Sequence, residues 1–199
     1  MTTLLVFWAA FGLAVASPGP NFAVILATAT RLGRPAAVRT ALGMACGEAV
    51  WGFAAVFGVA ALAAAHPSVA TMLRVGGGAI LLYMGFQSLR AAWRPASAPA
   101  PQAGTASMAR GFGLMLLNAK AGVFWVSITG VLIGPETSTG LAVAAVAGAV
   151  LISALWHLCL ALAFSTETAA RAYRRLSRGM DAALGAVLAG IGLRLVIPT

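Results

Sequence analysis

The feature that most constrains the fold of this chain is a series of long apolar segments that carry almost no charge. A transmembrane helix needs about 20 mostly apolar residues. Six segments reach that length, at roughly residues 3–29, 41–63, 69–91, 111–134, 139–164 and 180–197. Only 9% of the residues are charged, whereas a soluble domain typically carries about 25%. The sequence therefore predicts an all-α, polytopic membrane protein with six transmembrane helices.

Arginine side chains gather in every second connection between these segments, and this distribution predicts the orientation. The three groups are Arg31, Arg34 and Arg39; Arg90, Arg94 and Arg110; and Arg171, Arg174, Arg175 and Arg178. Because cytoplasmic loops carry an excess of Lys and Arg, both termini are predicted outside, on the periplasmic face of the cell inner (plasma) membrane. The net charge of +9 then reflects topology. No nucleic-acid partner is expected, because a phosphate-binding surface needs a soluble face.

A Pro- and Ala-rich stretch divides the chain. It contains the run PASAPAPQAGTAS, from Pro95 to Ser107, and this composition is typical of a linker. We therefore predict a first three-helix half at residues 1–94, a cytoplasmic linker at 95–109 and a second three-helix half at 110–199. Halves with three helices each must insert with opposite topology, so the prediction is two inverted three-helix repeats, an architecture common among transporters.

The first apolar segment is interrupted by helix-breaking residues. Proline lacks a backbone N–H and clashes with the preceding helical turn, at a cost of about 3 kcal/mol in a regular helix. The interruption reads Ser17, Pro18, Gly19, Pro20, Asn21. We expect a break near residues 16–20, with Ser17 or Asn21 as the N-cap of the helix that follows. The amides at that helix start would form a favourable site for an anion such as a carboxylate.

Two charged side chains are predicted deep in the membrane. Lys120 lies ten residues past Arg110, hence about 15 Å along a helix, which is half of a hydrocarbon layer about 30 Å thick. Glu48 lies nine residues past Arg39, at a similar depth. Either the two form a buried pair, or each meets a substrate charge of opposite sign. The substrate-binding candidates are Pro18, Gly19, Pro20, Asn21, Glu48, Asn118 and Lys120.

Other polar residues admit more than one interpretation. Glu48 and His157 are the candidates for proton coupling, since imidazole has an unperturbed pKa of about 6.5; a hydrogen-bonded structural histidine is the alternative. Asp181 is expected to pair with Arg178 or to cap the last helix. Glycine-rich helices allow a homodimer without requiring one.

Enzyme and cofactor motifs do not occur in the sequence. There is no nucleophile elbow, P-loop, dinucleotide-binding fingerprint or metal-ligand spacing, so we expect no enzyme activity, no cofactor and no metal site. Two alternatives stay open. One is a membrane thiol-disulfide carrier that uses Cys46 and Cys159. The other is an exporter of a metal ion or another metabolite, which the single deep carboxylate disfavours.

Four motifs together resemble a known family. They are SPGPNFAVI from Ser17, GMACGEAVWGF with Glu48, GGGAILLYMGFQSLR with Tyr83, and LLNAKAGVFW with Asn118 and Lys120. The chain resembles the LysE/RhtB-type amino-acid exporters, the lysine/threonine exporter family, over nearly its whole length. One departure is Ala119, where the family usually has proline. The resemblance implies export of amino acids or close derivatives across the inner membrane, energised by the proton-motive force.

Overall fold

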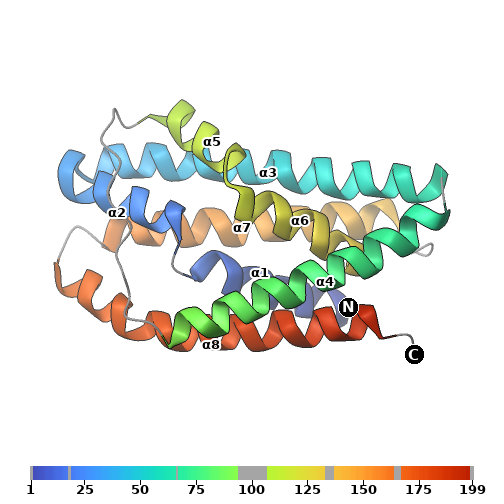
Figure 1. Ribbon diagram of the computed structural model, residues 1–199. Coiled ribbons are helices and arrows are strands. Elements are labelled where there is room, and N and C mark those ends of the chain that lie inside the picture. Colours follow the sequence, from blue (N-terminus) through green and yellow to red (C-terminus); the bar gives the residue numbers. More distant parts are fainter. Residues whose placement is uncertain are drawn as a thin grey trace.

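The computed structural model describes residues 2–17, 19–65, 67–93, 107–132, 137–163 and 167–197. Within these ranges every regular element is a helix, which confirms the all-α prediction. The helices are α1 (Thr2–Ala16), α2 (Pro20–Leu32), α3 (Arg34–Ala65), α4 (Pro67–Ala92), α5 (Met108–Leu116), α6 (Ala119–Leu132), α7 (Thr139–Ala163) and α8 (Glu167–Val196). They form an elongated bundle in which α1 begins and α8 ends at the same end (Figure 1). Nearly all of the predicted linker lies outside the described residues.

Three helices of the described part are long and apolar enough to cross a membrane, namely Arg34–Gly58, Thr139–Ala163 and Leu176–Val196. Two bent helix pairs raise this number to five if each pair is one span, α1 with α2 and α5 with α6. The chain is thus a multi-pass membrane protein with three to five candidate spans. The predicted third segment is occupied by α4, which is not among the five candidate spans. The candidate span in α8 begins at Leu176, earlier than the predicted start at residue 180.

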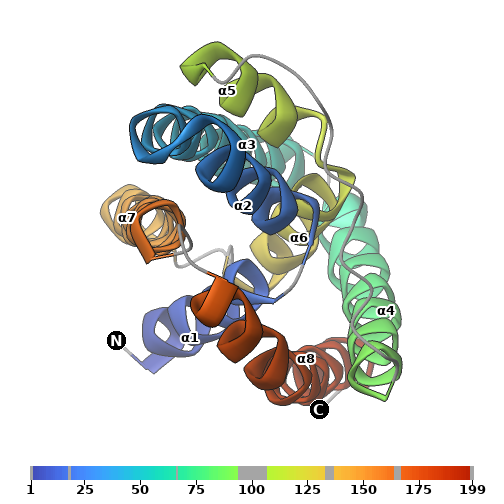
Figure 2. The same ribbon diagram turned by 90° about the vertical axis from the view of Figure 1, so that its left-hand side faces the viewer.

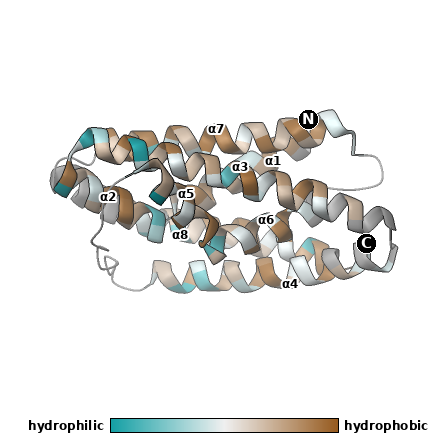
Figure 3. Ribbon diagram, turned by 90° about the horizontal axis from the view of Figure 1, so that it is seen from above, coloured by the Kyte–Doolittle hydropathy of each residue, from teal (hydrophilic) through white to brown (hydrophobic). Residues whose placement is uncertain are grey.

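The outer surface of the bundle is apolar, as a lipid-facing surface requires. Large apolar side chains point outward on several helices, for example Phe86 on α4, Leu151 on α7 and Leu176 on α8. Apolar residues dominate most of the helices in the view coloured by hydropathy (Figure 3). A soluble monomer rarely exposes large contiguous apolar patches. The many exposed apolar side chains and the low charge content therefore both indicate a membrane environment.

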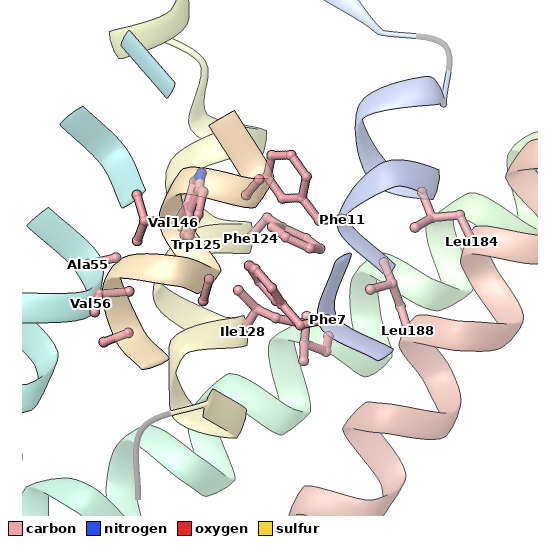
Figure 4. Packing of buried hydrophobic residues seen from close by; sticks show 14 residues of the cluster. Phe7, Phe11, Ala55, Val56, Phe124, Trp125, Ile128, Val146, Leu184 and Leu188 are labelled. Atoms are coloured by element: carbon pink, nitrogen blue, oxygen red, sulfur yellow. The ribbon is translucent and has the colours of Figure 1, made fainter. Parts of the chain in front are cut away.

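Aromatic side chains fill the centre of the bundle. Trp125 on α6 is fully buried, with its ring centroid 5.4 Å from that of Phe11 and 5.9 Å from that of Phe7. Phe124 and Ile128 extend the cluster along α6, and Leu188 reaches it from α8 (Figure 4). This packing holds α6 against α1.

Close backbone contacts fix the positions of the helices around this core. The end view shows α4 beside α8, and α5 beside α3 on the opposite side (Figure 2). At the α3–α5 crossing, a Cβ added to Gly111 would overlap the carbonyl oxygen of Thr40. Gly33 joins α2 to α3 with φ of 81°, a left-handed conformation that glycine adopts without strain. The helices α2, α5 and α6 lie beside α3.

Candidate functional site

The first bent pair has the predicted break between its halves. Helix α1 ends at Ala16 and α2 begins at Pro20, with an angle of 53° between them. The N-cap of α2 is Gly19, which forms no side-chain cap hydrogen bond. The prediction that Ser17 or Asn21 is the N-cap of this helix is therefore wrong. Proline suits the first helical position, so Pro20 sets the start of α2, leaving Ser17 too early and Asn21 inside the helix. Pro18 lies outside the described residues.

The second bent pair is broken as well, although Ala119 stands where a proline was expected. Helix α5 ends at Leu116 and α6 begins at Ala119, with an angle of 58°. The side-chain oxygen of Asn118 accepts a hydrogen bond of 3.1 Å from the Lys120 amide, which is an N-cap contact. The Met115 carbonyl, near the end of α5, accepts from the Asn118 amide and from the Trp51 indole. Side-chain capping at both helix ends therefore maintains this break.

The two breaks contact each other. The Asn118 side-chain amide donates to the Asn21 side-chain oxygen at 3.1 Å, and the Asn21 amide group approaches the Met115 sulfur at 3.5 Å. The two asparagines predicted for the substrate site therefore lie together at the starts of α2 and α6. The N-terminal ends of both half-helices, where backbone dipoles are positive, meet inside the bundle.

A cavity opens beside this junction. It encloses about 490 Å³ of empty space when the open solvent at its mouth is included. The predicted site residues that line it are Gly19, Pro20, Asn21, Glu48, Asn118, Lys120 and His157. The remaining lining residues are Ser17 and the apolar Phe11, Ala14, Val15, Phe22, Ala121 and Phe124. The structure thus brings together every predicted site residue that it describes.

Glu48 enters the cavity from α3 and is held by two hydrogen bonds. Only 4% of the residue is exposed. The Trp125 indole donates to one carboxyl oxygen, and the Ser153 hydroxyl lies 3.3 Å from the other. The same hydroxyl is 3.2 Å from Nδ1 of His157. Glu48, Ser153 and His157 therefore form a continuous hydrogen-bonded series between α3 and α7.

Lys120 is held by the end of α1. Its ammonium nitrogen lies 3.4 Å from the Ser17 hydroxyl and 3.5 Å from the Ala14 carbonyl oxygen. In a continuous helix that carbonyl would accept from the amide of residue 18, but Pro18 has no N–H. Lys120 thus satisfies a carbonyl that the break leaves without a helical partner. In the described part of the chain, Lys120 and Glu48 form no ion pair with each other.

Several polar residues at the site were not predicted from the sequence. Asp181 was expected to pair with Arg178 or to cap a helix, but it lies inside α8 and accepts a hydrogen bond of 2.6 Å from Ser17. The sequence did indicate that Asp181 has a special role, because a carboxylate is costly within an apolar segment long enough to cross a membrane. Ser153 precedes His157 by four residues and therefore shares its helix face. Nothing in the sequence marked Trp125 as the donor to Glu48.

Cys46 and Cys159 lie away from the cavity. Both are free thiols, both are exposed, and neither lines the cavity. Among the described residues, no group of three or more His, Cys, Asp or Glu could hold a metal ion.

Comparisons with known proteins agree on one family. The family described as LysE type translocator matches residues 6–199. The threonine efflux protein of Escherichia coli (strain K12) is 34% identical over 191 residues, which cover 93% of each chain. The threonine efflux protein of Salmonella typhi is 32% identical with the same coverage. The uncharacterized membrane protein YahN of Escherichia coli (strain K12) is 34% identical over 90% of this chain and 82% of its own. No solved structure matches.

Proposed function

The chain belongs to the LysE type translocator family, and on this premise we propose that it exports an amino acid or a close derivative across the inner membrane. The observation that carries the proposal is that Glu48 and Lys120 line one cavity without forming an ion pair with each other. A buried charge costs several kcal/mol to remove from water, and a zwitterionic substrate would offer each of these two side chains a group of opposite sign at the cavity. Two charges of opposite sign on one cavity suit a zwitterion.

The carboxylate of the substrate would bind at the junction of the two breaks. The N-terminal ends of α2 and α6 favour negative charge, and Lys120 adds a full positive charge on the same cavity wall. Gly19 and Pro20 present no bulky polar side chain there, so a carboxylate can approach the backbone of α2. Asn21 and Asn118 would orient it with their side-chain amides.

The ammonium group would bind at Glu48. The Trp125 indole and the Ser153 hydroxyl occupy one direction on each carboxyl oxygen, and an ionised carboxylate has further lone pairs for a donor. Three phenylalanines, Phe11, Phe22 and Phe124, line the same cavity and would contact the substrate side chain.

Proton coupling would use the same carboxylate. Glu48 would hold either the substrate ammonium or a proton, so the two would exclude each other. Ser153 has a single hydroxyl hydrogen and lies between Glu48 and His157. A proton arriving at His157 could pass to Glu48 if the serine donates its hydrogen to the carboxylate while accepting one from the imidazole. Driving by the proton-motive force would follow from this exchange.

The architecture that we propose is two inverted three-helix halves, 1–94 and 110–199, with both termini outside. It is supported by the position of the two broken spans, which are the first span of each half. One half rocking against the other would expose the cavity to each side of the membrane in turn.

The two rival functions have less support. A thiol-disulfide carrier would need Cys46 and Cys159 to meet at a functional site, whereas both are exposed away from the cavity. A metal-ion exporter would need several oxygen ligands from carboxylates, and among the lining residues only Glu48 supplies one.

The test is counterflow in proteoliposomes containing the purified protein. A panel of neutral, hydroxylated and basic amino acids is offered with and without an inside-acid or inside-alkaline pH gradient. We expect saturable transport of at least one amino acid of the panel. The transport rate should be higher under the pH gradient whose direction favours export. Transport of none would refute the proposal.

Variants test the assignment of the two charges. Glu48→Gln and Lys120→Met should each raise KM about tenfold or more, since a hydrogen bond to a charged group contributes about 1.5–3 kcal/mol. Glu48→Gln should also reduce the preference for the amino acid over its analogue without an amino group. Gln87→Ala, an exposed site on α4, is the control that should transport normally.

A further inference from the structure

Asp181 is a buried acid that the proposed transport cycle does not use. It lies in the membrane-length segment Leu176–Val196 of α8, and 8% of it is exposed. An ionisable side chain at such a position is costly and calls for a partner. Its partner is the hydroxyl of Ser17, which donates to the Asp181 carboxylate at 2.6 Å. Ser17 is the first residue after α1, directly before the break.

The same hydroxyl links Asp181 to Lys120. The Lys120 ammonium lies 3.4 Å from the Ser17 oxygen, so Ser17 accepts from the ammonium while it donates to the carboxylate, as a serine hydroxyl can. Ammonium, hydroxyl and carboxylate thus form a series across α6, the end of α1 and α8. The Ser17–Asp181 bond, at 2.6 Å, has the length of a charge-assisted hydrogen bond, and such bonds are about twice as strong as neutral ones. The contact from Lys120 to Ser17, at 3.4 Å, is longer.

The geometry also explains why Lys120 does not reach Glu48. Its ammonium is placed at the C-terminal end of α1 by the Ala14 carbonyl and by Ser17. The negative end of the α1 dipole and the Asp181 carboxylate both attract a cation there. Glu48 lines the same cavity from α3 and His157 lines it from α7, but their hydrogen bonds run to Trp125 and Ser153.

We propose that Asp181 is a positioning residue that acts through Ser17 to keep the Lys120 ammonium charged and fixed at the cavity wall. Asp181 does not line the cavity, so a substrate carboxylate would meet Lys120 without meeting the acid behind it. The role in substrate binding rests on the proposed function. The effect on Lys120 itself does not, and it can be measured separately.

Lys120 is the single lysine in the sequence, which makes its amine a selective probe. The purified full-length protein, with any tag free of lysine, is treated with an amine-reactive reagent, and modified Lys120 is quantified by mass spectrometry. Only the uncharged amine reacts. Asp181→Asn should increase the labelling rate at a given pH about tenfold, because the carboxylate that favours the ammonium is gone. Ser17→Ala should increase the rate by a smaller factor.

Two further variants make the labelling result specific. Asp181→Glu retains the charge and should label much more slowly than Asp181→Asn. Arg178→Gln changes an exposed charge one turn away on α8 and should label as the unsubstituted protein does. Equal labelling of Asp181→Asn and the unsubstituted protein would overturn the proposal. So would equal acceleration by Arg178→Gln. If Asp181→Asn does not fold, Ser17→Ala decides the matter by the same criterion.

Transport kinetics test the second half of the inference. Asp181→Asn should raise the substrate KM about tenfold with a smaller change in Vmax, and it should have no additional effect in a Lys120→Met background. Additive effects in that background would refute a role through Lys120. If the unsubstituted protein transports no amino acid, the proposed function fails, while the labelling result still decides whether Asp181 positions Lys120.

Discussion

Replacing Gly111 with alanine tests the helix crossing that positions the second break. Gly111 lies on α5, where it faces α3, and an added Cβ would overlap the Thr40 carbonyl oxygen and lie 2.9 Å from the Thr40 carbonyl carbon. These are backbone atoms, so no side-chain rotation can relieve the contact. The two helices must move apart. Because α5 ends at Leu116, such a movement would also displace Asn118 and the start of α6.

The magnitude follows from two opposing effects. Overpacking a well-packed site costs about 1–3 kcal/mol, and a clash with a backbone belongs at the upper end. Alanine recovers about 1 kcal/mol relative to glycine in a helix interior. The net loss is about 2 kcal/mol. Gly113 supplies a matched control two residues along the same helix, because an added Cβ there meets nothing within 4 Å. Gly113→Ala should therefore gain about 1 kcal/mol.

The two variants should differ by about 3 kcal/mol, or about 6–12 °C in melting temperature for a chain of this size. The difference in melting temperature is measured by thermal unfolding in detergent, with size-exclusion chromatography and fluorescence detection as the readout of folded protein. Gly111→Ala should also transport more slowly than Gly113→Ala at a temperature where both are folded. If the two variants have the same melting temperature, α3 and α5 do not cross backbone to backbone. The α3–α5 crossing then does not position the second break.

Three further variants test the proposed function and the second break. Ser153→Ala should lower transport driven by a pH gradient more than it lowers counterflow, because only the former would need the hydroxyl between Glu48 and His157; equal losses in both assays would exclude a proton relay. Cys46→Ser combined with Cys159→Ser should leave counterflow within about twofold, since surface substitutions usually change little, and a complete loss would favour the thiol carrier. Trp51→Phe removes one of two donors to the Met115 carbonyl and should cost about 1 kcal/mol, measured by thermal unfolding, whereas unchanged stability would show that this bond does not support the break.

Sequence reasoning predicted a common depth for Glu48 and Lys120 because depth in a membrane can be counted along a helix. Each residue advances about 1.5 Å, so distances from the flanking arginines placed Glu48 and Lys120 at one level. Both line the cavity that the structure contains. Two prolines predicted the first break, because a missing N–H is a property of the residue itself and needs no tertiary contact to act.

Partners across the bundle could not be predicted in the same way. Asp181 accepts a hydrogen bond from Ser17, which lies 164 positions away in the sequence. Nothing in the sequence around either residue indicates that the other is its partner. The Trp125 indole donates to Glu48 across 77 positions. Periodicity reports which helix face is apolar, but it does not report how a face is rotated toward its neighbours. These hydrogen bonds depend on that rotation, so they require coordinates.

Ala119→Pro tests whether the second break already has the backbone of a proline break. Ala119 is the first residue of α6, the position where proline is favoured because its N–H is not needed and its fixed φ suits a helix. Asn118 precedes it as N-cap, and N-cap residues have the extended backbone that a following proline requires. The substitution should therefore be tolerated. It should stabilise the folded protein by about 0.4–1 kcal/mol, because proline reduces the conformational entropy of the unfolded chain.

Val123→Pro is the matched comparison. Val123 lies one turn further along α6 with an outward-facing side chain, where a proline removes an internal hydrogen bond and clashes with the preceding turn, at a cost of about 3 kcal/mol. Thermal unfolding should rank Ala119→Pro at or above the unsubstituted protein and Val123→Pro well below it. If Ala119→Pro is as damaging as Val123→Pro, α6 does not begin at residue 119 in the membrane. The contact between the two breaks, through Asn21 and Asn118, would then lose its structural basis.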